Sequence, residues 1–356
     1  MSYSRSIFLT GFPGFIAGRL VERLAAIETQ FFLLVQKRFV DTASTMVERV
    51  AFETGVPIEN FALVEGDIAS GGLGIASDDL ETILGETTDV FHLAAVYDLA
   101  IDKDIATAIN LEGTKNVNEF ARSVNELRRY NYVSTCYVAG KREGEILEND
   151  LEHKKGFRNY YEESKYLAEK EVEKLKSELP VTIFRPSVVV GDSKTGETTK
   201  YDGIYYLIQY LRKWPALLRT INVGNKRVRL NLVPVDFVTE AIALLSEDEK
   251  AVGKTIALAD PEPLTTAELF DLIANELSGK ESIIRPPEKL IEWSLMTPVS
   301  PPVTGLPHHG VPYFFLSQTY NTAVADALLE PHGLKCPNFG DYVGNLIDFV
   351  KKHPEL

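Results

Sequence analysis

The stretch Thr10-Gly11-Phe12-Pro13-Gly14-Phe15-Ile16-Ala17-Gly18 decides how the fold of this chain is interpreted. It follows the apolar run Ile7-Phe8-Leu9 and precedes Leu20, Val21 and Leu24, whose spacing is typical of a helix. A strand that leads through a glycine-rich turn into a helix presents backbone N–H groups to a pyrophosphate. The spacing Gly-x-x-Gly-x-x-Ala differs from the commonest dinucleotide fingerprint, Gly-x-Gly-x-x-Gly. Taken alone, the stretch therefore also fits an ordinary strand-to-helix turn.

The composition limits the classes of protein to which the chain can belong. It has 356 residues, 45% of them hydrophobic, which suits one large domain or two fused ones. Its net charge of −14 argues against binding to nucleic acid or to anionic membranes. We find no apolar run long enough for a membrane span and no signal peptide, so a cytoplasmic protein is expected. The two cysteines, Cys136 and Cys336, have no metal-ligand spacing, and no metal site is predicted.

Strands and helices alternate along roughly the first 190 residues. Strands are expected at residues 6–10, 31–35, 61–64, 90–95, 130–135 and 181–186, with helices at 18–28, 42–54, 78–84, 110–121 and 157–179. This alternation predicts an α/β fold: a Rossmann-type, doubly wound parallel sheet with helices on both faces. The expected nucleotide-binding domain is 1–190, rejoined by part of 230–262. Proline and aromatic residues become more frequent after Gly191, so 191–356 is interpreted mainly as a smaller, C-terminal substrate-binding region.

The carboxyl ends of the expected strands form the predicted cofactor site, since ligands of such sheets bind there. The second strand ends at Gln36-Lys37-Arg38. An acidic residue at this place suits a ribose 2′-hydroxyl and basic residues suit a 2′-phosphate, so NADP is favoured over NAD. Asp67 is placed to accept a hydrogen bond from adenine, although an ordinary turn aspartate explains it equally well. The other residues predicted to contact the cofactor are Thr10, Gly11, Phe12, Pro13, Gly14, Phe15, Ile16, Ile68, Leu93, Ala94, Ala95, Tyr161, Lys165, Pro186, Ser187 and Val188.

Tyr161 and Lys165 are four residues apart on the helix expected at 157–179, and so share one helical face. A phenol has a pKa near 10, and a nearby ammonium lowers it. The pair is then suited to exchange a proton with a substrate oxygen during hydride transfer. Such a pair is common on helix surfaces, but Thr135 ends a strand at the same sheet edge and its hydroxyl is placed to hold a substrate carbonyl. Asn110 fits either a water relay from Lys165 or a helix N-cap.

Three other features carry charge or titratable groups. The segment from Asp192 to Arg229 has eight basic and three acidic residues, which suits either a solvated surface or a field for a phosphorylated substrate. His92 lies in a buried strand and is interpreted as a core histidine. His308 and His309 lie in a proline-rich segment, interpreted as an exposed loop rather than a lid, and no role is assigned to them.

Seven motifs occur in the order found in extended short-chain dehydrogenase/reductases, and the chain resembles that family over roughly residues 5–260. They are the stretch from Thr10 to Ala17, Gly66-Asp67-Ile68, His92-Leu93-Ala94-Ala95, Asn110-Leu111-Glu112-Gly113-Thr114, Val133-Ser134-Thr135-Cys136-Tyr137-Val138-Ala139-Gly140, Tyr161-x-x-x-Lys165 and Arg185-Pro186-Ser187. In that family the hydroxyl partner of the tyrosine lies five residues before the glycine, which implies Thr135 rather than Ser134. Pro13 and Ala17 depart from the family pattern, and Pro13 removes one N–H that might meet a phosphate.

The branch of the family that the chain most resembles is that of the thioester reductases and fatty-acyl reductases, whose members reduce acyl thioesters with NADPH. The segments that carry this resemblance are Val133-Ser134-Thr135-Cys136-Tyr137-Val138-Ala139-Gly140 and Ala94-Ala95-Val96-Tyr97-Asp98-Leu99. The resemblance implies an NADP-dependent oxidoreductase acting on a carbonyl, alcohol or acyl-thioester substrate with an apolar portion, such as an acyl-CoA. Tyr161 would be the acid/base, Lys165 would tune it and hold the ribose, and Thr135 would position the substrate oxygen. The alternatives are a nucleotide-sugar epimerase or dehydratase that holds NAD(P) tightly, and a dinucleotide sensor without turnover. A homodimer is the family's common form.

Overall fold

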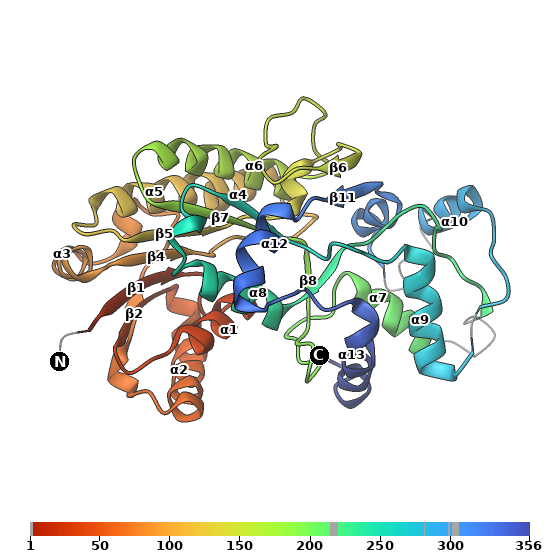
Figure 1. Cartoon of the computed structure of the whole chain (residues 1–356), viewed down its shortest axis with the longest axis horizontal. Coiled ribbons are helices and arrows are strands. Elements are labelled where there is room, and N and C mark those ends of the chain that lie inside the picture. The colour runs from red at the N-terminus through yellow and green to blue at the C-terminus, as the bar shows by residue number, and fades with distance from the viewer. Residues whose placement is uncertain (1–2, 214–219, 281, 298–299, 301–305) are drawn as a thin grey trace.

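The structure is a computed structural model that describes residues 3–213, 220–280, 282–297, 300 and 306–356. Figure 1 shows a parallel sheet flanked by helices and, beside it, a smaller region formed by helices from the second half of the chain. Within the described residues, no helix is both long and apolar enough to cross a membrane.

Seven parallel strands form the main sheet, in the order β10-β7-β5-β4-β1-β2-β3. Their bounds are β1 (Arg5–Thr10), β2 (Thr29–Val35), β3 (Phe61–Glu65), β4 (Asp89–His92), β5 (Arg129–Val133), β7 (Val181–Pro186) and β10 (Thr255–Leu258). The central strands are buried along nearly their whole length, as expected for a parallel sheet covered on both faces. The strand order reverses between β1 and β4, which is where doubly wound sheets bind their ligands.

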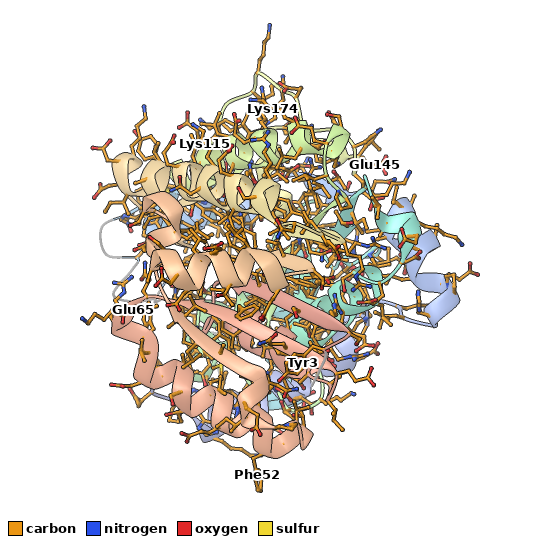
Figure 2. The ribbon with its side chains drawn as sticks, turned by 90° about the vertical axis from the view of Figure 1, so that its left-hand side faces the viewer. Tyr3, Phe52, Glu65, Lys115, Glu145 and Lys174 are labelled. Carbon is orange, nitrogen blue, oxygen red and sulfur yellow. The ribbon has the colours of Figure 1, made fainter. Side chains whose placement is uncertain are left out.

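Helices cover both faces of this sheet, and the predicted fold class is thereby confirmed. One face packs against α1 (Phe15–Leu24), α2 (Val40–Thr54) and α8 (Val235–Leu245). The other packs against α3 (Ser77–Glu86), α5 (Gly113–Ser123) and α6 (Tyr160–Glu173). Figure 2 shows these layers from the side, with Phe52 of α2 below the sheet and Lys115 of α5 and Lys174 above it.

The smaller region has a hydrophobic core of its own. It is built from α7 (Ile204–Lys213), α9 (Thr266–Ser278), α10 (Glu288–Leu295) and α13 (Phe339–Lys352). The short parallel pair β8 (Val188–Val190) and β9 (Leu232–Pro234) leads into and out of it. The main cavity described below lies along the border between this region and the sheet.

The chain returns twice from its second half to the sheet. The first return comprises α8 and β10, within the part of the chain predicted to rejoin the sheet. The second is α12 (Ala323–Leu329), which follows β11 (Gln318–Tyr320), itself paired with β6 (Gly144–Ile146). Buried Glu148 accepts hydrogen bonds from the backbone N–H groups of Val324 and Ala325 at the start of α12 and from Ala257 of β10. This second return lies within the region predicted to bind substrate.

Candidate active site

The glycine turn lies against the ends of β1 and β4 without room for side chains. Gly11 has φ +97°, and a Cβ on it would lie 2.8 Å from the backbone N of Ala94. A Cβ on Gly14 would lie 2.6 Å from the carbonyl oxygen of Gly11. Helix α1 begins at Phe15, earlier than the predicted residue 18, and the N–H groups of its first turn have no intrahelical acceptors. The turn therefore fits a pyrophosphate that approaches the backbone closely.

A cavity of about 770 Å³ opens at the carboxyl ends of the strands. The residues predicted to bind the cofactor line it, with the exception of Lys37. Thr135, Tyr161 and Lys165 lie in the same wall, whereas Asn110 does not reach it. We call this the main cavity.

The two basic residues at the end of β2 have different surroundings. Arg38 lines the main cavity, and its guanidinium lies 4.7 Å from the ring centroid of Phe39. Its Nε donates to Gln36 Oε1 at 3.0 Å, and Gln36 Nε2 donates to Asp67 Oδ2 at 2.8 Å. Lys37 is exposed and lies outside the cavity wall. Of the two basic residues, Arg38 is thus the one that lines the main cavity.

Buried His92 of β4 links Thr10, at the start of the glycine turn, to Thr114 of α5. Its Nδ1 lies 2.8 Å from Thr10 Oγ1 and its Nε2 lies 3.0 Å from Thr114 Oγ1. Burial, and to a lesser degree the charge of Lys165, lowers the pKa of His92 to about 3, so the ring is neutral. The Thr114 hydroxyl donates a hydrogen bond to the carbonyl oxygen of Asn110 at 2.6 Å. The proton of His92 therefore resides on Nε2, and Nδ1 accepts from Thr10.

Thr135 contacts Tyr161, whereas the neighbouring Ser134 bonds a different residue. Thr135 lies just beyond β5, where its side chain accepts a hydrogen bond from Tyr137 N at 3.2 Å. Burial raises the pKa of Tyr161, although a hydrogen bond with Thr135 opposes the rise. The hydroxyl of Ser134 donates to buried Glu169. Of the two, the Thr135 hydroxyl is the one beside the phenol.

Lys165 differs from the expectation based on its spacing to Tyr161. Its Nζ donates to Tyr132 OH at 2.9 Å and to the carbonyl oxygen of Val133 at 3.0 Å. Burial lowers its pKa to about 8, against the opposing charge of Glu169. The predicted lowering of the Tyr161 pKa is wrong for the protein as it stands, because burial dominates and the ammonium is bound to other oxygens.

Asn110 is not a helix N-cap, and that prediction is wrong. It lies in a π-helical turn (Thr107–Glu112) between α4 (Lys103–Ala106) and α5, so the helix continues through it. Its buried amide accepts a hydrogen bond from Val96 N at 2.8 Å and donates to Ser164 Oγ at 3.0 Å. Asn110 therefore ties the segment after β4 to α6 from behind the cavity wall.

Some cavity residues were missed by the sequence analysis. Tyr97 exposes 43% of its surface, lines the cavity and packs edge-on against Tyr161, with ring centroids 5.1 Å apart. Lys200 and Asp202 also line the cavity, 3.4 Å apart, and Lys200 lies 5.6 Å from the ring centroid of Tyr97. The sequence held a signal in both cases: Tyr97 follows the small residues Ala94 and Ala95, which come after β4, and Lys200 belongs to the basic segment after Gly191.

The remaining candidates lie away from the reaction site. Of the described basic residues between 192 and 229, Lys200 alone lines the main cavity, and Arg219 falls outside the described residues. His308 and His309 are exposed, and His308 Nε2 lies 2.9 Å from the carbonyl oxygen of Thr297. Buried Cys136 donates to the carbonyl oxygen of Arg185. In the part of the chain that the structure describes, no three His, Cys, Asp or Glu residues are grouped to hold a metal ion.

The sheet order, the glycine turn at the switch point and the cavity together define a dinucleotide-binding α/β protein of the Rossmann type. The NAD-binding family described as "Male sterility protein" matches residues 9–242. The chain belongs to this family of extended short-chain dehydrogenase/reductases, in its fatty-acyl-reductase-like branch. The match to this NAD-binding family supports a nicotinamide dinucleotide as the cofactor.

Single curated proteins and solved structures are also similar to this chain. "Fatty acyl-CoA reductase wat" of Drosophila melanogaster is 26% identical over 274 residues, covering 67% of this chain and 53% of that protein. The chain thus spans about half the length of the first curated relatives it matches. The terminal R domain of the myxalamid PKS-NRPS pathway has a TM-score of 0.82 at 22% identity, covering 100% of this chain and 92% of that one. UDP-glucuronic acid 4-epimerase from Bacillus cereus, in complex with NAD, has a TM-score of 0.67 at 17% identity, covering 98% and 99%.

Proposed function

We propose that this protein is an NADPH-dependent reductase of acyl thioesters, and of the corresponding aldehydes, with an apolar acyl portion. The observation that carries the proposal is the contact of Thr135 with the buried phenol of Tyr161 in the wall of a cavity that also contains the glycine turn. We further propose that residues 1–190, with α8 and β10, hold the cofactor and that the smaller region holds the substrate. The protein is expected to act in the cytoplasm as a homodimer.

The residues of the wall suit proton donation to a substrate oxygen. Because burial raises the pKa of Tyr161, the phenol is protonated at neutral pH and is ready to donate. The Thr135 hydroxyl holds the same oxygen and orients the phenol. Lys165, whose pKa is about 8, is mainly cationic at pH 7. Its ammonium bonds Tyr132 and Val133, so it would act on the phenolate left behind through its charge, one helical turn from Tyr161, and not through a direct hydrogen bond.

The bound nicotinamide would supply a hydride to the carbonyl carbon. With a thioester, the oxygen takes the Tyr161 proton after hydride addition. The hydroxyl proton then passes to the departing sulfur as the carbon–sulfur bond breaks, which gives an aldehyde and a free thiol, and Tyr161 regains a proton from solvent. Reduction of the aldehyde by the same groups yields an alcohol. The fatty acyl-CoA reductases among the relatives support acyl thioesters as the substrate class.

The residues around the cofactor site support the preference for NADP. Arg38 faces the cavity at the end of β2, and its contacts with Gln36 and Phe39 hold the guanidinium in place. A planar guanidinium binds phosphate through paired charge-assisted hydrogen bonds. Gln36 occupies the place where an acidic residue would repel a 2′-phosphate.

The test is to purify the protein, measure bound dinucleotide and follow oxidation of NADPH and of NADH with acyl-CoA, aldehyde and nucleotide-sugar substrates. We expect NADPH oxidation that matches aldehyde or alcohol formation and a loss of about 10²–10⁴ in kcat for Tyr161→Phe. Sugar conversion with retained NAD and no net oxidation would instead identify an epimerase. Tight dinucleotide binding with no turnover of any substrate would identify a sensor. Either result would refute the proposal.

A further inference from the structure

A second cavity, of about 330 Å³, lies inside the smaller region. Its walls come from α7, α9, α10 and the 3₁₀ segment η9 (His308–Phe315), which lie together on the right of Figure 1. Tyr206, Leu207 and Tyr210 of α7, Phe270 of α9, and Ile291 and Leu295 of α10 form much of the surface. The described side chains that line it carry no charge.

The apolar lining and the size of this cavity point to a ligand. Protein interiors are packed closely and rarely leave voids larger than a water molecule. Ligand pockets begin at about 300 Å³ and are mostly apolar. An apolar cavity of about 150 Å³ holds one benzene molecule, so a cavity of about 330 Å³ has room for roughly twelve carbon atoms.

The second cavity borders the reaction site through the start of α7. Asp202 lines the main cavity, and Tyr206, four residues later in the first turn of α7, lines the second. Tyr206 also lies within electrostatic range of Tyr97. Tyr97 lines the main cavity and packs edge-on against Tyr161, so the rings of Tyr97 and Tyr161 form the part of the reaction site from which the chain leads, through Asp202, to the second cavity at Tyr206.

We propose that the second cavity is an acyl pocket that holds the distal part of an unbranched hydrocarbon chain and selects substrates by chain length. The inference rests on the proposed function, which places the carbonyl carbon beside Tyr161. The stretch of chain next to the carbonyl passes Tyr97, and about twelve further carbons fill the pocket. A pocket that is mostly apolar and uncharged favours a saturated chain over sugars and nucleotides, whose many polar groups would find few partners there.

The first experiment compares two matched variants of α10. Leu295 faces the pocket, whereas Leu290 lies outside its wall and exposes 54% of its surface. We expect kcat/KM for acyl-CoA substrates of 4 to 20 carbons to rise about fourfold for each methylene that enters the pocket, then level off. Leu295→Trp fills the pocket, and should lower the ratio of kcat/KM for dodecanoyl-CoA to that for propanoyl-CoA at least tenfold. Leu290→Trp should leave this ratio within twofold of wild type.

A complementary variant enlarges the pocket. Leu207→Ala removes three carbons from its wall and should move the levelling-off point to longer chains. Opposite shifts from filling and enlarging would not follow from a general loss of stability. If all three variants kept the wild-type dependence on chain length, the proposal would be overturned.

Direct binding separates failure of the pocket from failure of the proposed function. Calorimetry with dodecan-1-ol should show binding with a negative heat-capacity change, which Leu295→Trp abolishes and Leu290→Trp preserves. If no acyl-CoA or aldehyde were reduced but this pattern held, the proposed function would fail and the pocket would stand. If reduction occurred but dodecan-1-ol bound both variants equally, the pocket proposal would fail and the function would stand.

Discussion

Lys37 and Arg38 are neighbours in the sequence and carry the same charge, but their side chains have different surroundings. Both residues are exposed, but Arg38 lines the main cavity beside Gln36 and Phe39, whereas Lys37 lies outside the cavity wall. The sequence indicates a basic cluster suited to a 2′-phosphate but does not tell which of the two residues meets it. That choice depends on how the chain turns after β2, where the 3₁₀ segment η1 (Lys37–Phe39) begins.

The difference between the two residues leads to the first prediction. Arg38→Ala should raise the Kd for NADPH about 10- to 100-fold, because a charge-assisted pair with the 2′-phosphate contributes about 1.5–3 kcal/mol. The Kd for NADH should stay within about threefold, since NADH lacks the phosphate. Lys37→Ala is the matched control and should change neither value more than twofold. Fluorescence titration with both dinucleotides measures this, and equal losses in the two variants would contradict the placement.

Lys165 gives the second prediction, which concerns pH. Its pKa of about 8 means that the ammonium loses its proton as the pH rises through 8. We expect kcat/KM to fall about tenfold per pH unit above that value, while Tyr161, whose pKa is raised, stays protonated. Steady-state rates between pH 6 and 10 measure the profile.

The fall should not reflect unfolding. The pKa of Lys165 is lower in the folded state than its ordinary value of 10.5, so between about pH 8 and 10.5 the unfolded state binds more protons at this residue. The contribution of Lys165 to stability therefore increases with pH in this window. Lys165→Met should lose most of its activity and show no such fall in what remains. A wild-type kcat/KM that stays constant to pH 10 would count against a role for the ammonium.

Elements of secondary structure hold the site through buried polar contacts. The glycine turn follows β1, and the hydroxyl of Thr10 connects it through His92 of β4 to Thr114 of α5. Thr114 donates to the carbonyl oxygen of Asn110, and the side chain of Asn110 donates to Ser164 of α6, one residue before Lys165. The glycine turn and the part of the cavity wall that contains Lys165 therefore belong to one hydrogen-bonded framework.

His92→Phe tests this framework. Phenylalanine has a similar shape but removes the hydrogen bonds that the imidazole makes with the Thr10 and Thr114 hydroxyls. We therefore expect the free energy of unfolding to fall by about 1–3 kcal/mol. The Kd for the dinucleotide should rise about five- to tenfold, because the glycine turn loses its anchor. His153→Phe is the control, since His153 bonds the carbonyl oxygen of Val138 outside the cavity wall. It should lose stability with little change in Kd, and the same Kd change in both variants would contradict the prediction.

The sequence predicts these elements well where the pattern is local. Apolar runs mark the strands, and β1, β2 and β3 agree with their predicted positions to within two residues. The π-helical turn around Asn110 was missed because α4 and α5 continue through it, whereas an asparagine at a helix start usually caps it. The direction of the Lys165 side chain could not be read either, since helical spacing gives the face and not the hydrogen-bond partner.

At the scale of the whole molecule, contacts between residues far apart in the sequence position the two regions. Glu148 binds the start of α12 and also β10, which lie more than 100 residues further along the chain. No local pattern around residues 323–329 predicts that this helix returns to the main sheet. Tyr97, Lys200 and Tyr206 likewise come together only through the tertiary fold.

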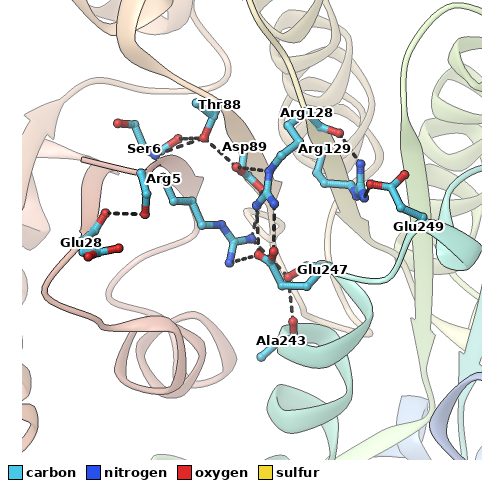
Figure 3. A network of polar contacts seen from close by, with 12 residues as sticks. Arg5, Ser6, Glu28, Thr88, Asp89, Arg128, Arg129, Ala243, Glu247 and Glu249 are labelled. Atoms are coloured by element: carbon cyan, nitrogen blue, oxygen red, sulfur yellow. Dashed lines mark hydrogen bonds and ion pairs between the residues drawn. The ribbon is translucent and has the colours of Figure 1, made fainter. Parts of the chain in front are cut away.

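At the amino ends of the strands, opposite the main cavity, ion pairs between side chains connect neighbouring elements. Asp89 at the start of β4 is fully buried and accepts hydrogen bonds from Arg5 of β1 at 3.0 Å, from Arg128 at 2.9 Å and from Thr88 at 2.7 Å (Figure 3). Both arginines also pair with Glu247, after α8. The network therefore joins β1, β4, the start of β5 and a helix of the outer layer at the amino ends of the strands.

Asp89→Asn removes the one buried acid of this network and should destabilise the protein by about 3 kcal/mol, because breaking a buried pair leaves the partner charges poorly compensated. Glu249→Gln is the control, since Glu249 pairs with Arg129 but its side chain is 82% exposed, and it should cost at most about 1 kcal/mol. Urea unfolding curves measure both. The six residues of β1 place the network about 17 Å from the glycine turn, so the dinucleotide Kd of folded Asp89→Asn should equal that of wild type. A large change in that Kd would mean that the amino ends of the strands and the cavity are coupled, which the separate contacts of Asp89 and His92 argue against.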